Sequence, residues 1–284
     1  MRPLRAVQQI QIGSIASTHE RARAVLEQLA AWGYEAIELN GFMTRPSSLL
    51  VRALTRAAGM PVGRAGHVDW ATLVPAAGLR VVALHEDLGT IERDADAVAR
   101  HADRLDTDTV VITGMYRFDY SDPAALDTLV RRLNAAGVAL GERGLRLLYH
   151  NHSVEFRRLP SGRSAFDLIV EGTDPRAVGF ELDCFWAATA GADPLALMRR
   201  LDTRVELCHL TDRGSRRTGS ALTPIDRIDS VELGLGNLDI PALVAQAASV
   251  NARAVIVETH KNWIDGSPLR SAEVSAAVLN RLLV

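Results

Sequence analysis

The stretch LRLLYHNH, Leu145–His152, joins an apolar run to a polar end, and the rest of the fold can be worked out from it. The run has the length and composition of a buried strand, and His150 stands where that strand ends. Three later apolar runs end in the same way, with Asp183, His209 and Glu258. Polar residues that recur at the ends of buried strands indicate parallel strands whose carboxyl ends share one face.

Eight units of an apolar run, a polar turn and an amphipathic stretch can be placed along the chain, as in successive βα units. The predicted strands are Ala6–Ile12, Ala36–Asn40, Arg80–His85, Thr109–Thr113, Arg146–His150, Val178–Asp183, Val205–Leu210 and Ala254–Glu258. The predicted helices are Thr18–Trp32, Pro46–Ala58, Arg93–Leu105, Pro123–Glu142, Ser164–Glu171, Pro194–Leu201, Pro241–Val250 and Leu269–Leu282. Prolines in first turns and glycines after last turns support these helix boundaries.

Strict alternation of this length allows a closed barrel or an open doubly wound sheet. A dinucleotide-binding sheet would carry G-x-G-x-x-G after its first strand, whereas Ile12–Ser17 has one glycine. We interpret LGLGN, Leu233–Asn237, as a tight turn rather than a phosphate loop. Two connections are long: Gly59–Gly78, where an extra helical turn is expected at Trp70–Ala77, and Thr211–Asp239. No linker divides the chain, so we predict a single (β/α)8 TIM barrel domain over residues 1–284.

The composition suits a barrel enzyme for small ligands. The chain has 284 residues, of which 48% are hydrophobic, enough for one large core. Its formal net charge of −2 gives no field that favours nucleic acid or a membrane surface, so a small neutral or weakly charged molecule is the expected partner, with a homo-oligomer left open. The start lacks a signal-peptide pattern and no run reaches 18 apolar residues, which predicts a cytoplasmic protein.

The two cysteines, Cys184 and Cys208, cannot build a disulfide framework. Each neighbours a residue that ends a predicted strand, so strand alternation turns both thiols away from the barrel interior. We therefore interpret them as packing residues rather than as metal or redox groups.

His150, Asp183, His209 and Glu258 converge at the carboxyl mouth of the barrel if these strands are adjacent. Two imidazoles and two carboxylates can bind one divalent metal ion and leave positions for substrate oxygens. This donor set favours manganese, with Co, Zn, Fe or Mg as alternatives. The competing interpretation is that buried acids at strand ends are helix caps or ion-pair partners.

Further polar and aromatic residues follow the other strands. Glu38 and His85 end the second and third strands and would face the same mouth, where they could contact a sugar hydroxyl. His152 and Glu155 lie just beyond the fifth strand, either in the site or as ordinary loop groups. Aromatic residues that could form a wall against a sugar face are Phe42, Trp186 and Trp263, of which Trp186 is nearest in sequence to a ligand.

These residues resemble the xylose isomerase-like barrel superfamily, often labelled sugar phosphate isomerase/epimerase, which includes ketose 3-epimerases and inosose dehydratases. The similarity is strongest to a branch whose fifth strand ends in Y-H-N-H. The blocks that carry the resemblance are YHNHSVEF (149–156), GYEAIELNG (33–41), GLRVVALH (78–85), Phe180–Asp212, VELGLGNLDIPAL (231–243) and AVIVET (254–259).

The resemblance implies a divalent metal held by His150, Asp183, His209 and Glu258. Epimerases of the family commonly have, at the fifth-strand position, a glutamate that binds metal and moves a proton, and this chain has His150 there. The base is therefore expected to be Glu155, His152 or Glu258. His260 stands where an acidic residue commonly occurs, and is expected as an acid or an extra substrate contact.

The function expected from these features is a metal-dependent isomerase or epimerase. It would remove a proton next to the carbonyl of a ketose or keto-sugar derivative and stabilise the enediolate. The runner-up is a metal-dependent lyase or dehydratase that expels a β-leaving group from a keto-sugar, keto-inositol or 3-keto-glycoside. Two further alternatives are an abasic-site endonuclease, which would need several metals and a basic groove, and a metal-free barrel that senses sugars.

Overall fold

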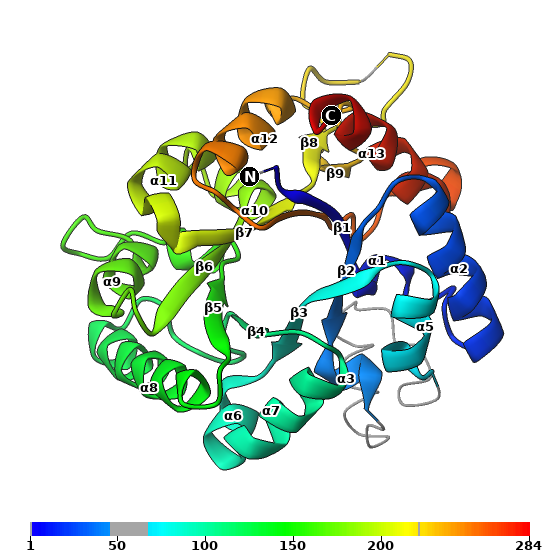
Figure 1. Ribbon diagram of the computed structural model, residues 1–284. Coiled ribbons are helices and arrows are strands. Elements are labelled where there is room, and N and C mark those ends of the chain that lie inside the picture. The colour runs from blue at the N-terminus through cyan, green and yellow to red at the C-terminus, as the bar shows by residue number, and fades with distance from the viewer. Residues whose placement is uncertain (1, 46–67, 221) are drawn as a thin grey trace.

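Eight parallel strands form a closed barrel in the computed structural model, which describes residues 2–45, 68–220 and 222–284 (Figure 1). Each strand pairs with the next along the chain, and the first pairs with the last. The strands are β1 (Leu4–Gln8), β2 (Ala36–Asn40), β3 (Arg80–Glu86), β4 (Thr109–Thr113), β5 (Arg146–His150), β6 (Val178–Asp183), β7 (Val205–Leu210) and β10 (Ala254–Val257). The predicted closed barrel is confirmed, and the open doubly wound sheet is excluded.

An outer ring of helices covers the strands (Figure 1). The longer helices are α2 (His19–Ala31), α5 (Trp70–Ala76), α6 (Leu88–Arg93), α7 (Ala95–Arg104), α8 (Pro123–Gly141), α9 (Ala165–Gly172), α11 (Pro194–Leu201), α12 (Ile240–Ser249) and α13 (Pro268–Leu282). The other helical segments, which follow strands or lie in connections, are α1 (Gln9–Ile12), α3 (Gly41–Thr44), α10 (Cys184–Thr189), η1 (Val154–Phe156), η2 (Asp202–Arg204) and η3 (Ile264–Gly266). The predicted helix Pro46–Ala58 lies outside the described residues. Among the described helices, none is long and apolar enough to cross a membrane.

Two apolar layers hold the barrel together. One lies between the strands and the helices and contains most of the buried hydrophobic residues. The other fills the barrel interior with small and branched side chains: Ala6, Ala36, Val82, Ala83, Val111, Leu148, Leu207, Ala254 and Ile256. Cys184 and Cys208 belong to the first layer, are free, and have their Sγ atoms 3.5 Å apart, which confirms that they pack outside the barrel interior.

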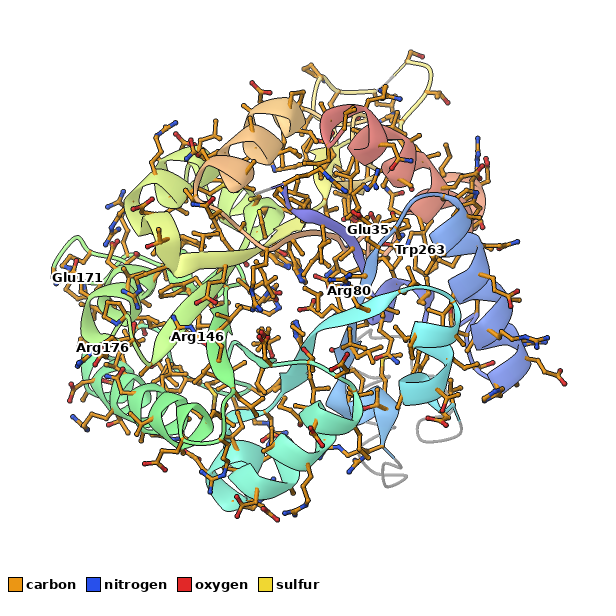
Figure 2. The ribbon with its side chains drawn as sticks, viewed as in Figure 1. Glu35, Arg80, Arg146, Glu171, Arg176 and Trp263 are labelled. Carbon is orange, nitrogen blue, oxygen red and sulfur yellow. The ribbon has the colours of Figure 1, made fainter. Side chains whose placement is uncertain are left out.

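Ion pairs lie near the amino ends of the strands. Arg146, at the start of β5, donates from Nε to Glu206 Oε1 of β7 at 2.6 Å. Glu35, labelled in Figure 2, lies just before β2 and accepts hydrogen bonds from the Arg2 and Arg5 guanidinium groups. The carboxyl ends of the strands lie at the opposite end of the barrel. The expected ligands His150, Asp183, His209 and Glu258 are found there.

The predicted first strand, Ala6–Ile12, was wrong in its second half. β1 ends at Gln8, whose side-chain Oε1 accepts from the backbone N–H of Ile10 and caps the short helix α1. Gln9 Oε1 accepts from the backbone N–H of Asn40, and Gln11 Oε1 accepts from that of Thr259. The glutamines thus tie the end of β1 to neighbouring chain segments instead of extending the strand.

The long connection Thr211–Asp239 contains a two-stranded antiparallel sheet that was not predicted, β8 (Asp212–Gly214) and β9 (Asp229–Val231). The Asp212 carboxylate accepts from the backbone N–H groups of Gly234, Gly236 and Leu238 at 2.9, 3.0 and 3.1 Å. LGLGN is therefore the predicted tight turn, and its N–H groups are directed to a carboxylate of the protein itself. Only glycine fits at Gly236, because a Cβ there would lie 2.2 Å from Asp212 Oδ1.

Candidate metal centre at the barrel mouth

The four expected ligands come together where β5, β6, β7 and β10 end. His150, Asp183, His209 and Glu258 are buried, and one possible ligand atom from each lies within 4.8 Å of the others. His209 Nδ1 is 2.8 Å from Glu258 Oε2 and 4.0 Å from Asp183 Oδ2, and His150 Nε2 is 3.9 Å from Asp183 Oδ2. We call these four residues the outer group.

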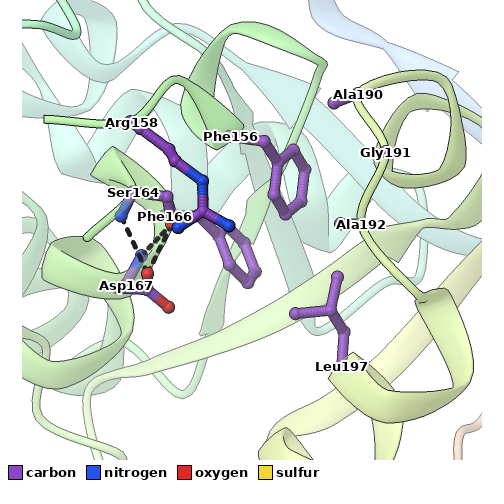
Figure 3. Close-up of a pocket in the computed structure, with 9 residues that line it drawn as sticks. All are labelled: Phe156, Arg158, Ser164, Phe166, Asp167, Ala190, Gly191, Ala192 and Leu197. Atoms are coloured by element: carbon purple, nitrogen blue, oxygen red, sulfur yellow. Dashed lines mark hydrogen bonds between the residues drawn. The ribbon is translucent and has the colours of Figure 1, made fainter. Parts of the chain in front are cut away.

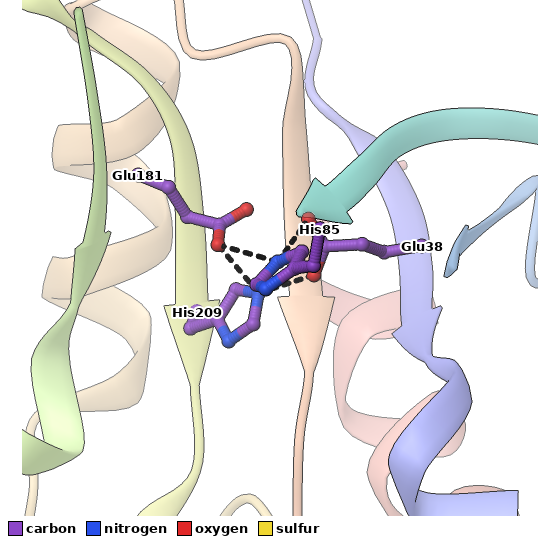
Figure 4. Close-up of side chains that lie close together, drawn as sticks. All are labelled: Glu38, His85, Glu181 and His209. Atoms are coloured by element: carbon purple, nitrogen blue, oxygen red, sulfur yellow. Dashed lines mark hydrogen bonds and ion pairs between the residues drawn. The ribbon is translucent and has the colours of Figure 1, made fainter. Parts of the chain in front are cut away.

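A second cluster lies against the outer group and shares His209 with it. This inner group consists of Glu38, His85, Glu181 and His209 (Figure 4). His209 Nε2 is 2.7 Å from Glu38 Oε2, and His85 Nε2 is 2.9 Å from Glu38 Oε1 and 3.1 Å from Glu181 Oε2. Glu38 and Glu181 are completely buried.

Glu181 is the functional candidate that the sequence analysis did not single out. It stands two residues before Asp183 on β6, and alternate residues of a strand face the same side of a sheet. The period of two would therefore have placed Glu181 in the barrel interior with Asp183. Its carboxylate lies 2.9 Å from His150 Nδ1, so it touches an expected ligand.

Burial and neighbouring charges shift the pKa values of the outer group in different directions. Burial raises the pKa of Asp183 to about 7, and the negative charge of Glu258 acts in the same sense. Burial also opposes ionisation of Glu258, but His260 and His209 outweigh it and hold the Glu258 pKa well below its usual value. Burial opposes protonation of His209, but Glu181, Glu38 and Glu258 outweigh it and hold the His209 pKa well above its usual value.

The buried acids at this end of the barrel outnumber the buried imidazoles that face them. The carboxylates are Glu38, Glu181, Asp183 and Glu258, and the imidazoles are His85, His150 and His209. Burial lowers the pKa of His150, which leaves still less positive charge to balance the acids. Uncompensated buried charge is costly, so a divalent cation fits this cluster by charge as well as by donor type.

Three rings surround the outer group at the mouth. The His152 ring lies 5.0 Å from that of His150 and 5.9 Å from that of Trp186, measured between centroids. The Trp186 ring lies 6.3 Å from that of His260, whose Nε2 is 3.4 Å from Glu258 Oε2. The structure thus brings His152, Trp186 and His260 together beside the outer group, as half-buried side chains.

The sequence of this barrel also matches a known family. Residues 26–282 match the family model of the xylose isomerase-like TIM barrel, which covers most of the chain. The chain belongs to this family. The resemblance drawn from the sequence blocks is therefore confirmed, whereas no curated protein matches the chain.

Several solved structures are similar to this xylose isomerase-like barrel. One is a sugar phosphate isomerase/epimerase from Parabacteroides distasonis ATCC 8503, with TM-score 0.75, 22% identity and 97% of this chain and 92% of that chain covered. A second is the probable 3-DHS dehydratase AsbF from Bacillus anthracis, with TM-score 0.69, 13% identity and 99% of both chains covered. A third is the IolI protein with a binding zinc atom, with TM-score 0.63, 14% identity and 98% of both chains covered. At these identities the similarity shows the shared fold.

Glu155 of the xylose isomerase-like barrel lies in the loop after β5 and is completely buried. Its Oε1 accepts from the Tyr149 hydroxyl at 2.9 Å, and its Oε2 accepts from the backbone N–H of His152 at 3.0 Å. Burial raises the Glu155 pKa, although these hydrogen bonds act against the rise. Both carboxylate oxygens are thus engaged with the protein, and one of them fixes the backbone of His152.

Glu86, the neighbour of His85 in sequence, is a further acid at the end of β3. Glu86 is buried at the end of β3, where it pairs with Arg45 and lies 3.5 Å from His101 Nδ1. Strand alternation directs it to the side of β3 opposite to that of His85. His85 therefore belongs to the inner group, whereas Glu86 faces away from the barrel interior and contacts Arg45 and His101.

A small surface cavity lies beside η1, α9 and the connection from α10 to α11 (Figure 3). Phe156, Phe166 and Leu197 contribute its apolar walls. Its one acid, Asp167, accepts hydrogen bonds from Ser164 and Arg200 and completes the capping box of α9, whose N-cap is Ser164. Ser164 and Asp167 of this cavity thus support the helix, and the cavity contains none of the outer-group residues.

Proposed function

We propose that this chain is a metal-dependent isomerase or epimerase that acts on a ketose or keto-sugar derivative by proton abstraction and an enediolate. The observation that carries the proposal is the outer group, in which ligand-type side chains end four neighbouring strands at the mouth of a barrel. The rings of His152, Trp186 and His260 beside it offer a wall and polar atoms to a small polyhydroxy ligand. Family membership and the similar sugar phosphate isomerase/epimerase structure support the same reaction class.

His150, Asp183, His209 and Glu258 would hold one divalent ion, with manganese expected first and Co, Zn, Fe or Mg as alternatives. The zinc atom of the similar IolI protein supports a divalent ion in this barrel type. When bound, such an ion polarises a substrate carbonyl and lowers the pKa of the neighbouring C–H. The outer group suits this role better than the inner group, because it adjoins the half-buried rings of the mouth.

Proton transfer at two faces of the substrate carbon is assigned to Glu258 and His152. Glu258 follows β10 and His152 follows β5, and the strands β7 and β6 separate them, so the two groups approach from different sides of the mouth. Glu258 is held as a carboxylate, and burial lowers the His152 pKa to about 3, so both are unprotonated at neutral pH, as a proton acceptor must be. Glu155 positions His152 through its backbone N–H.

The remaining expected substrate contacts divide into two kinds. Trp186 and His260 lie at the mouth and are proposed to contact the sugar directly. Glu38 and His85 face imidazole and carboxylate groups of the inner group instead of the mouth, so we propose that they act on the substrate only indirectly.

A panel of ketoses incubated in heavy water tests this proposal by NMR. With metal restored to chelator-treated protein, deuterium should enter the carbon next to the carbonyl of the true substrate. Asp183→Asn should abolish both the bound metal and the exchange. Turnover with all protium retained at that carbon would rule out the proposed proton abstraction.

A metal-dependent lyase is the second candidate, and His260 is the observation that favours it. Burial opposes protonation of His260, but Glu258 outweighs it and raises the His260 pKa, which makes the imidazolium available as an acid for a departing group. His260→Gln should then prevent release of the leaving group while deuterium exchange continues. The appearance of an absorbing enone or of a released aglycone would decide for the lyase.

A further inference from the structure

We propose that Glu181 and Glu38 are positioning residues that fix His150 and His209 in opposite tautomers. The inference rests on the proposed metal centre and concerns how its two imidazoles are prepared. His150 Nδ1 lies 2.9 Å from Glu181 Oε2, and His209 Nε2 lies 2.7 Å from Glu38 Oε2. Each expected imidazole ligand thus has one nitrogen against an inner carboxylate and the other toward the outer group.

The tautomers follow from the chemistry of these contacts. A neutral imidazole has one N–H and one lone pair, and an ionised carboxylate only accepts hydrogen bonds. His150 therefore keeps its proton on Nδ1 and presents the Nε2 lone pair toward Asp183, 3.9 Å away. His209 has a carboxylate at each ring nitrogen, Glu38 at 2.7 Å from Nε2 and Glu258 at 2.8 Å from Nδ1. If a metal ion took the Nδ1 lone pair together with Glu258, the remaining ring proton would stay on Nε2 against Glu38. Without Glu38, Glu258 would favour the proton on His209 Nδ1, the nitrogen that a metal ion needs free.

His85 joins the two positioning carboxylates. Its Nε2 lies 2.9 Å from Glu38 Oε1 and 3.1 Å from Glu181 Oε2, so one ring approaches both acids. Negative charge on Glu38 and Glu181 outweighs the effect of burial and raises the His85 pKa to about 10. An imidazolium between two carboxylates reduces their mutual repulsion, and it explains how two fully buried acids lie in one barrel interior.

The same contacts argue against a second metal ion in the inner group. To bind a metal there, His209 would have to lose its Nε2 proton while Nδ1 serves the outer group. Glu38 and Glu181 would also have to turn away from His209 and His150. The arrangement therefore predicts one metal ion per chain, with the inner group as its support.

The test measures manganese affinity and stoichiometry by calorimetry for Glu181→Gln and Glu38→Gln. Loss of a carboxylate that orients an imidazole ligand typically weakens metal binding by about 10- to 100-fold, and that loss is expected for both variants. Glu86→Gln is the matched control, because Glu86 is also a buried acid on β3 but lies on the other side of that strand from His85. It should keep the wild-type affinity.

A double-mutant cycle separates positioning from a general loss of negative charge. Glu181→Gln should weaken manganese binding more when His150 is present than in a His150→Ala background, where only the 3.2 Å contact of Glu181 Oε2 with His209 Nε2 is left to lose. Ring ¹⁵N NMR of the zinc-loaded wild type gives a readout that does not depend on turnover. It should show the proton of His150 on Nδ1 and that of His209 on Nε2.

The outcomes distinguish this inference from the proposed function. Wild-type metal affinity in both Gln variants, the opposite tautomers, or two metal ions per chain would overturn the positioning role alone. A wild type that binds no metal would overturn the proposed function, and this inference would fall with it.

Discussion

Asp183→Asn should make the chelator-treated protein more stable at pH 8 and remove its response to metal. Asp183 has two roles in the structure: Oδ2 faces His150 and His209, and Oδ1 accepts from the backbone N–H of Trp186 at 2.7 Å. Asparagine keeps an oxygen for the second role, and it is a good residue at a helix N-cap. The substitution therefore removes the buried charge with little damage to the start of α10.

The magnitude follows from the Asp183 pKa, which burial raises from 3.8 to about 7. The folded protein then binds this proton more tightly than the unfolded chain, so the stabilisation is present below pH 3.8 and is lost as the pH rises through 7. Between pH 5 and pH 8 the wild type should lose about 3 kcal/mol that the variant keeps. For a chain of 284 residues, this is a relative change in Tm of about 5 °C.

Metal should largely cancel this difference between the two proteins, because it stabilises only the wild type. An ion at 100 times its Kd stabilises a folded protein by about 2.7 kcal/mol, which for this chain raises Tm by about 4 to 5 °C. Thermal unfolding of wild type and Asp183→Asn, at pH 5 and pH 8, with EDTA or manganese, measures both effects. Parallel pH profiles for the two proteins in EDTA, or an equal rise in Tm on adding manganese, would show that Asp183 is neither a costly buried charge nor a ligand.

Three further substitutions test the surroundings of the centre. Tyr149→Phe removes the hydroxyl donor to Glu155 and should lower the free energy of unfolding by about 1 to 3 kcal/mol in urea titrations, whereas a change below experimental error would contradict the buried hydrogen bond. Asp212→Asn should speed amide hydrogen exchange within residues 234–238, and unchanged protection would show that the carboxylate does not hold that turn. Trp186→Ala should raise KM for the sugar several-fold at unchanged manganese affinity; an unchanged KM would remove Trp186 from the substrate wall.

Much of the fold could be predicted because each strand carries its own signal. The bounds of β2, β4, β5, β6 and β7 agree with the predicted strands, since short apolar runs between polar turns leave little freedom. The first strand could not be bounded in this way. Gln8 ends it by capping α1 with its side chain, and a glutamine within an alternating sequence gives no sign that it will act as a cap.

The candidate site was predictable in its outer part and not in its inner part. The last residues of strands mark the mouth of a barrel, so His209 and Asp183 were found from position alone. Glu181 lies two residues before Asp183, deeper in the barrel interior. Apolar residues are usual at such buried strand positions, and acids are rare there. The burial of this carboxylate is compensated by its contacts with His150 and His85. These residues are 31 and 96 positions from Glu181 in the sequence, and a single sequence does not show which distant residues come into contact.

The position of the charged groups explains how this barrel can hold so many buried acids without losing its fold. Apolar side chains such as Ala6, Val111 and Ile256 fill one layer of the barrel interior, and a larger apolar layer lies beneath the helices. These layers supply the burial that stabilises the domain, independently of the inner and outer groups. The repulsion among the carboxylates is therefore confined to the carboxyl ends of the strands, where a divalent ion would relieve it. Metal binding should therefore raise the free energy of unfolding of this protein, but the barrel should also fold without metal.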